Sequence, residues 1–167
     1  VLIDDDDDTF LNMDGIFGLN IAEKLNWIFD FHNNTVELRN SKLNNQDFDI
    51  EIDYFEEKKN NSLPYLNAIV DKNILKLKID TGFENELSVS DSLIFNKSKF
   101  EFDTASIADV FGRKEREIAE FTLDTLIVSK YSFTNIKTRY ELSLKSSNLL
   151  GMKFFRRFKK FGIDSKQ

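Results

Sequence analysis

The chain has 167 residues, which is enough to bury a core as one domain or as a domain with an extension. Its net charge of -6 argues against general nucleic-acid affinity, and the absence of cysteine excludes disulfides and thiolate metal sites. No apolar run approaches the length of a membrane span, and no signal peptide is visible. Because the sequence starts at Val1 rather than Met, we expect a mature product or a fragment of a longer chain.

The N-terminal part is predicted to contain a strand at 1–3, a short helix within 13–25 and a hairpin of strands at 26–31 and 36–38. The five aspartates at 4–8 are interpreted as a solvated loop; a calcium site is the alternative, but the spacing of an EF-hand loop is missing. The single histidine, His32, is expected in a surface turn, and Trp27 is expected in the core. No metal site or cofactor is predicted, because His32 has no partner histidine.

The middle of the chain alternates between apolar and polar residues, which is typical of strands. We predict strands at 48–55, 65–70, 74–79 and 87–90, with a charged turn at 56–62 and a helical turn at 91–95. A tight turn around Asp71, Lys72 and Asn73 makes a hairpin of the second and third strands. Residues 40–46 form a polar connector and the best internal boundary.

The last part adds further short strands. Residues 103–111 fit either a strand or a helix, and strands are predicted at 115–123, 126–128, 133–144 and 161–164. A short helix follows Gly151, and the basic residues of 153–160 are interpreted as its solvated face rather than as an RNA contact. Many short strands with few helices predict an all-β barrel or sandwich.

Two segments of the chain resemble each other. Residues 16–30 and 149–164 both have two apolar residues, a glycine (Gly18 or Gly151), an apolar residue, a short helix and a strand that ends in aspartate (Asp30 or Asp164). The copies lie about 133 residues apart, with one residue inserted in the second copy. This is one domain length rather than a solenoid repeat. This echo indicates a duplicated domain, of which only the tail of the first copy is present.

The strand at 74–79 delivers Asp80 directly into the turn Asp80-Thr81-Gly82, and an apolar pair with glycine, Leu149-Leu150-Gly151, follows downstream. This order of strand, Asp-Thr-Gly turn and apolar-apolar-Gly segment resembles the aspartic peptidases of the pepsin-like and retropepsin-like type. The sequence of 151–158 looks like that of bacterial retropepsin-like members. The resemblance covers about 63–164. It implies an aspartic-peptidase-like closed β-barrel lobe with short helices at 47–167, preceded at 1–40 by the tail of a first similar lobe.

The resemblance also implies roles for individual residues. Asp80 matches the catalytic aspartate, Thr81 the residue whose hydroxyl braces two catalytic loops, and Gly82 the glycine that lets the backbone approach the carboxylate. Leu149, Leu150 and Gly151 match the strand that supports the catalytic loop. A flap is expected between 108 and 123, with Gly112 at or near its tip.

Two features depart from the family pattern. Phe83 replaces the usual small residue after the glycine, and no second Asp-Thr-Gly is present, since Gly15 after Asp14 opens the echo. The first hypothesis is therefore an aspartic endopeptidase acting on peptides or proteins, whose second aspartate comes from a twofold-related chain or from a preceding lobe. The alternatives are a non-catalytic peptide-binding or assembly module of the same fold and an unrelated β-sandwich surface domain. Export is favoured by the family resemblance.

Overall fold

The computed structural model describes residues 24–44, 55–57, 63–90, 100–109, 112–141 and 148–164. Its strands are β1 (Asn26–Asp30), β2 (Thr35–Arg39), β3 (Phe55–Glu57), β4 (Leu63–Val70), β5 (Asn73–Asp80), β6 (Leu87–Val89), β7 (Asp103–Asp109), β8 (Gly112–Val128), β9 (Tyr131–Glu141), β10 (Leu149–Gly151) and β11 (Lys160–Ile163). One short helix, α2 (Met152–Phe155), lies between β10 and β11. The predictions for 1–8, for the helix within 13–25, for 48–54 and for 91–95 fall wholly or mainly outside the described residues.

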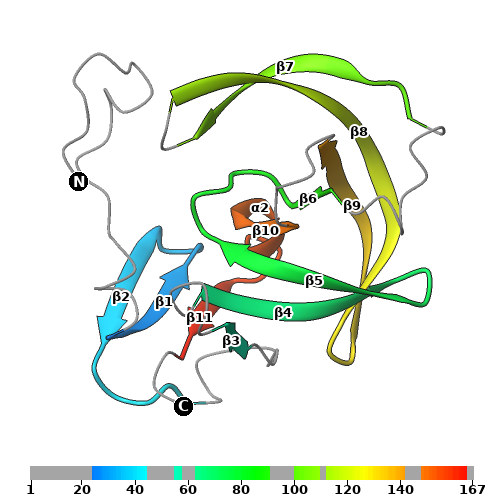
Figure 1. The fold of residues 1–167 in the computed structure, drawn as a ribbon. Coiled ribbons are helices and arrows are strands. Elements are labelled where there is room, and N and C mark those ends of the chain that lie inside the picture. The colour runs from blue at the N-terminus through cyan, green and yellow to red at the C-terminus, as the bar shows by residue number, and fades with distance from the viewer. Residues whose placement is uncertain are drawn as a thin grey trace.

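Six strands close into a barrel. The larger sheet has the order β3-β4-β5-β10-β6-β9-β8-β7, and an additional pairing of β4 with β8 joins its two sides. The ring therefore runs through β4, β5, β10, β6, β9 and β8, while β3 and β7 extend it at the margins (Figure 1). Two of the neighbouring pairs, β5 with β10 and β6 with β9, are parallel. The predicted all-β class and closed barrel are confirmed.

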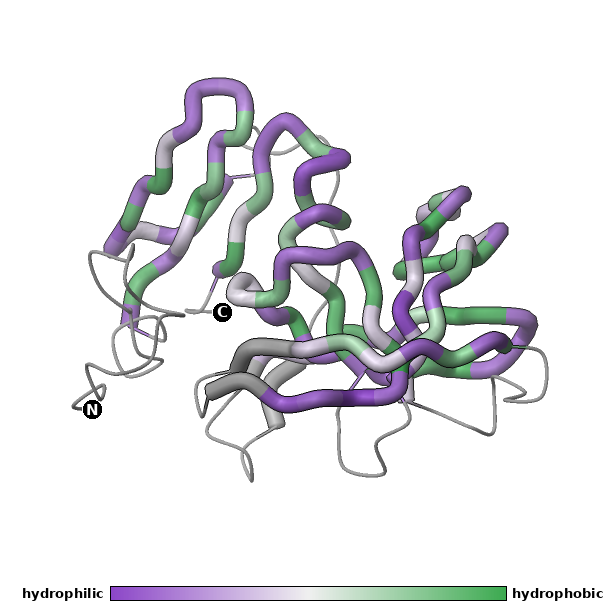
Figure 2. Tube along the Cα trace, turned by 90° about the horizontal axis from the view of Figure 1, so that it is seen from above, coloured by the Kyte–Doolittle hydropathy of each residue, from purple (hydrophilic) through white to green (hydrophobic). Residues whose placement is uncertain are grey.

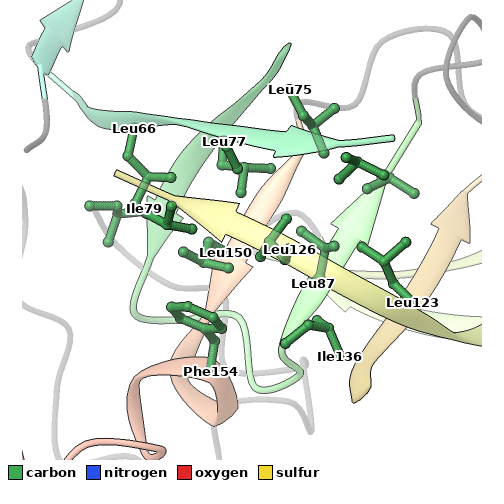
Figure 3. Packing of buried hydrophobic residues seen from close by; sticks show 14 of the residues in the cluster. Leu66, Leu75, Leu77, Ile79, Leu87, Leu123, Leu126, Ile136, Leu150 and Phe154 are labelled. Atoms are coloured by element: carbon green, nitrogen blue, oxygen red, sulfur yellow. The ribbon is translucent and has the colours of Figure 1, made fainter. Parts of the chain in front are cut away.

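The barrel is filled by the apolar residues that alternate along its strands. On β5, Leu75, Leu77 and Ile79 are buried and the residues between them are more exposed. Figure 3 shows these side chains meeting Leu150 from β10 and Phe154 from α2. Along the chain, hydrophilic and hydrophobic stretches alternate in the same way, and hairpin ends are hydrophilic (Figure 2).

A second, three-stranded sheet has the order β11-β1-β2 and lies beside the barrel (Figure 1). Its β1–β2 turn is fixed by Asp30, whose Oδ1 accepts hydrogen bonds from the backbone N–H groups of His32 (3.1 Å) and Asn33 (3.0 Å). The Asn33 hydrogen bonds, together with Lys160 at 3.3 Å, lower the pKa of Asp30 to about 2. As predicted, His32 lies in this turn and is exposed.

The two echo strands pair with each other. β1 and β11 run antiparallel, with Ile28 opposite Gly162. These two residues occupy equivalent positions in the echo. When each residue is replaced by its echo equivalent, the pair of Trp27 with Ile163 becomes the pair of Phe161 with Phe29, which also exists. The pairing is therefore symmetric about a local twofold axis through Ile28 and Gly162.

Several predicted boundaries need correction. β3 extends to Glu57, into the predicted turn at 56–62. For 103–111, where the sequence fits either a strand or a helix, residues 103–109 form a strand. The strands predicted at 115–123 and 126–128 are one strand of 17 residues, because the pairing with β9 keeps the same register on both sides of Asp124, with Leu123 opposite Ile136 and Thr125 opposite Thr134. Trp27 is half-buried and stacks on Phe29 in the small sheet rather than in the barrel core. None of the described helices is long and apolar enough to cross a membrane.

Candidate active site

Strand β5 brings Asp80 to the end of the barrel wall. Because side chains alternate along a strand, the burial of Ile79 turns the neighbouring carboxylate away from the core. The Asp80 side chain is 31% exposed, so its carboxylate is accessible to solvent. Lys78, two residues earlier on the same face, places its Nζ 3.7 Å from Oδ2, a partly exposed pair that contributes little to stability.

The turn after Asp80 holds the carboxylate in place. The backbone N–H of Gly82 donates to Asp80 Oδ1 at 3.0 Å, and the N–H of Phe83 donates to the Asp80 carbonyl at 3.1 Å. Bonds of this kind to a turn aspartate are also common outside catalytic sites. What distinguishes this turn is therefore the strand that lies against it.

That strand is β10, which the sequence predicted as the support of the catalytic loop. It pairs in parallel with β5, so that Leu150 lies opposite Ile79 and Gly151 lies opposite Asp80. A side chain on Gly151 would collide with the carbonyl oxygens of Phe83 and Asn85, so only glycine lets this loop cross so closely. The structure thus brings Leu149–Gly151 and the Asp80 turn together from opposite ends of the barrel sequence.

Phe83 does not cover the carboxylate completely. Its ring turns toward β10, where Cδ1 would lie 2.5 Å from a Cβ added to Gly151. The Phe83 carbonyl in turn accepts a hydrogen bond from the N–H of Met152 at 2.8 Å. The bulky residue is thus packed against the start of α2, and Asp80 keeps the exposure given above.

Other predicted residues are placed without being joined to this turn. Thr81 is exposed, and Gly112 begins β8 and pairs with Asp109 across the β7–β8 hairpin. Within the described residues, the polar side-chain contacts of Asp80 come from Gly82 and Lys78 and not from a second carboxylate. The described part of the chain also holds no cluster of three histidine, aspartate or glutamate side chains suited to a metal ion.

Sequence reasoning missed one ion pair near the turn, in which the carboxylate partner is buried. Glu86 is 6% exposed, and its Oε1 accepts a hydrogen bond from Arg157 Nε at 2.6 Å. Arg157 is exposed, as predicted for this solvated face, but its side chain also donates hydrogen bonds to Glu86 and to two carbonyls of β9. No spacing in the sequence links two residues that are 71 positions apart.

A closed all-β barrel in which an Asp-Thr-Gly turn ends one strand and packs on an apolar-apolar-Gly strand defines a retropepsin-like fold. A solved structure agrees with this class: the chain is similar to a retropepsin-like aspartic protease from Rickettsia conorii, with a TM-score of 0.53 and 23% identity. The match covers 69% of this chain and 100% of that protein. No family profile and no curated protein matches the chain. At this identity the similarity shows the fold.

Proposed function

We propose that the protein is an aspartic endopeptidase, or one half of a two-lobed one, in which Asp80 is a member of the catalytic pair. Of two carboxylates that share one proton, the ionised one takes a proton from a water molecule as its oxygen attacks the peptide carbonyl, and the other gives its proton to the tetrahedral intermediate. The C–N bond then breaks as a carboxyl proton passes to the leaving amine. The titration of such a pair belongs to both groups together. The observation that carries the proposal is the accessible Asp80 carboxylate at the end of β5, held by Gly82 and lying beside Gly151 in a retropepsin-like barrel.

The second carboxylate must come from outside the described residues. The echo and the local twofold between β1 and β11 favour a preceding lobe of the same type, of which 1–40 is the tail. A second copy of the chain is the other source. In either arrangement Thr81, which is exposed at the turn, braces the two loops through its hydroxyl.

The remaining residues complete the proposed site. Leu149 and Leu150 anchor β10 beneath the turn, and Gly151 admits the crossing loop. The β7–β8 hairpin with Gly112 near its tip acts as a flap, under which a peptide binds as an extended strand.

The central test replaces Asp80 with asparagine. We expect Asp80→Asn to abolish cleavage of a fluorogenic peptide library at acid pH, including any cleavage inhibited by pepstatin, because an amide cannot act as the base. Asp71→Asn is the matched control: it makes the same chemical change in the exposed β4–β5 turn, where φ is 47° and asparagine is well tolerated. Cleavage by Asp80→Asn at the wild-type rate would contradict the proposal.

The source of the second carboxylate is tested by cross-linking. Since the chain has no cysteine, Thr81→Cys introduces a single thiol at the exposed turn. A disulfide-linked dimer indicates two facing copies, whereas a monomeric mass without cross-linking supports the preceding lobe.

A peptide-binding or assembly module of the same fold is the second candidate. It is favoured by the single Asp-Thr-Gly and by Phe83, whose ring occupies space beside the turn. Two results together would establish this candidate. The wild type cleaves no peptide with either source of the second carboxylate supplied, and both the wild type and Asp80→Asn bind peptide.

A further inference from the structure

The segment that leads away from the Asp80 turn is fixed to α2 along its length. The N–H groups of Met152 and Lys153 donate to the carbonyls of Phe83 (2.8 Å) and Glu84 (3.2 Å). The N–H of Gly151 donates to the carbonyl of Glu86 at 2.9 Å. Three backbone bonds therefore hold residues 83–86 against the start of the helix.

The Glu86 side chain extends this attachment to a third element. The side chain is 8% exposed; its Oε1 accepts from Arg157 Nε and its Oε2 accepts from the backbone N–H of Lys137, each at 2.6 Å. The other Arg157 nitrogens donate to the carbonyls of Thr134 (3.0 Å) and Asn135 (2.9 Å). One buried carboxylate thus connects residues 83–86, Arg157 after α2 and strand β9.

Such an arrangement is costly unless every group is paired. A buried carboxylate is stable only where donors replace its hydration, and here two short bonds do so. Asn135, one of the residues that Arg157 holds, has a φ of 56°, which is rare for a residue other than glycine within a strand. Arg157 therefore binds an irregular point of β9 rather than an arbitrary surface.

We infer that Glu86 and Arg157 are positioning residues that set the location of the Asp80 turn relative to β10. The turn is closed at its start by the Phe83 N–H to Asp80 carbonyl bond, and its continuation is anchored at Glu86. A carboxylate that must meet a second one within hydrogen-bond reach requires such a fixed backbone. The catalytic meaning of this inference rests on the proposed function, but the placement of the turn does not.

The test compares amide hydrogen exchange in three variants. Glu86→Gln is nearly isosteric, but it replaces one acceptor oxygen by an NH2 donor that faces either Arg157 Nε or the Lys137 N–H. The double variant Glu86→Gln with Arg157→Met removes both charges, so that no guanidinium is left facing a neutral amide. Glu141→Gln is the matched control, since Glu141 lies on β9, is 8% exposed and has its carboxylate bound by Ser88 Oγ at 3.1 Å and by Arg116 Nη1 at 3.9 Å, neither of which belongs to residues 83–86.

We expect Glu86→Gln to accelerate exchange of the Phe83 and Gly151 amides by about tenfold or more relative to the change in global stability. The double variant should regain stability without regaining protection of these two amides, a separation that a merely structural role does not produce. Glu141→Gln should leave their protection in step with global stability. Exchange that follows global stability in all variants would overturn the inference.

Kinetics provide a separate readout. If the wild type cleaves peptides, Glu86→Gln should lower kcat with KM nearly unchanged, because substrate contacts remain while the reacting groups are displaced. If the wild type cleaves nothing, the proposed function fails, and the exchange measurement still decides whether Glu86 positions the turn.

Discussion

Replacing Gly151 with alanine tests the packing of the candidate site most directly. The added Cβ would lie 2.5 Å from Phe83 Cδ1 and closer still to the carbonyl oxygens of Phe83 and Asn85. The backbone angles of Gly151 are φ -108° and ψ -177°, which alanine adopts freely, so the effect comes from the lack of space.

The size of the effect follows from what must move. The ring of Phe83 can turn aside, but the carbonyls of Phe83 and Asn85 cannot. For these carbonyl oxygens to reach an ordinary van der Waals distance from the new Cβ, residues 83–85 must shift by about 1 Å. That shift weakens the bonds from Gly151 N–H to Glu86 and from Met152 N–H to Phe83, at roughly 1 kcal/mol each. With overpacking of about 1–3 kcal/mol added, Gly151→Ala should destabilise the fold by about 3–5 kcal/mol.

Urea unfolding followed by circular dichroism measures this loss. Gly82→Ala is the control, because its Cβ would meet only Asp80 Oδ1, at 3.3 Å, in an exposed turn, and it should cost much less. Phe83→Ala combined with Gly151→Ala should recover little of the loss, since the carbonyls remain. A loss below about 1 kcal/mol for Gly151→Ala, or full recovery in the double variant, would refute the reasoning.

Two further predictions concern stability. Because the pKa of Asp30 is lowered to about 2, its charged form stabilises the fold above the unfolded pKa of about 4. This contribution is lost as the pH falls from about 4 to about 2. The difference in unfolding free energy between wild type and Asp30→Asn, measured by urea titration at each pH, should therefore shrink over that window. Phe154→Ala should cost about 3–5 kcal/mol, because the ring is fully buried and packs on Phe133, whereas Ile74→Ala, at 71% exposure, should change stability by less than about 0.5 kcal/mol in the same assay.

The parts of the fold that the sequence predicted well are local. The apolar alternation on β5 and the turn that follows place Asp80 at a strand end without reference to the rest of the chain. The β4–β5 hairpin was likewise predictable, since Asp71 and Lys72 take up the positive φ values, 47° and 71°, that a tight hairpin turn needs.

What escaped prediction depends on partners distant in sequence. The length of β8 is set by its pairing with β9 and not by its own interrupted pattern, so it was predicted as two strands. Glu86 and Arg157 are residue types of the surface, and the pairing of β10 with β6, continued by the bond from Gly151 N–H to the Glu86 carbonyl, brings them together. The burial of Glu86 is a tertiary effect that overrides residue preference, whereas Arg157 stays exposed.

The local twofold also bears on where the proposed second aspartate lies. In the described lobe, Asp80 precedes Gly151 by 71 residues and lies opposite it across β5 and β10. Gly18 is the echo of Gly151, so under the proposal of a preceding lobe the equivalent aspartate would stand a similar distance before Gly18, ahead of Val1. The axis through Ile28 and Gly162 would then relate the two turns as it relates β1 and β11. Under the proposal of a preceding lobe, a single Asp-Thr-Gly is what the second half of a duplicated peptidase would carry.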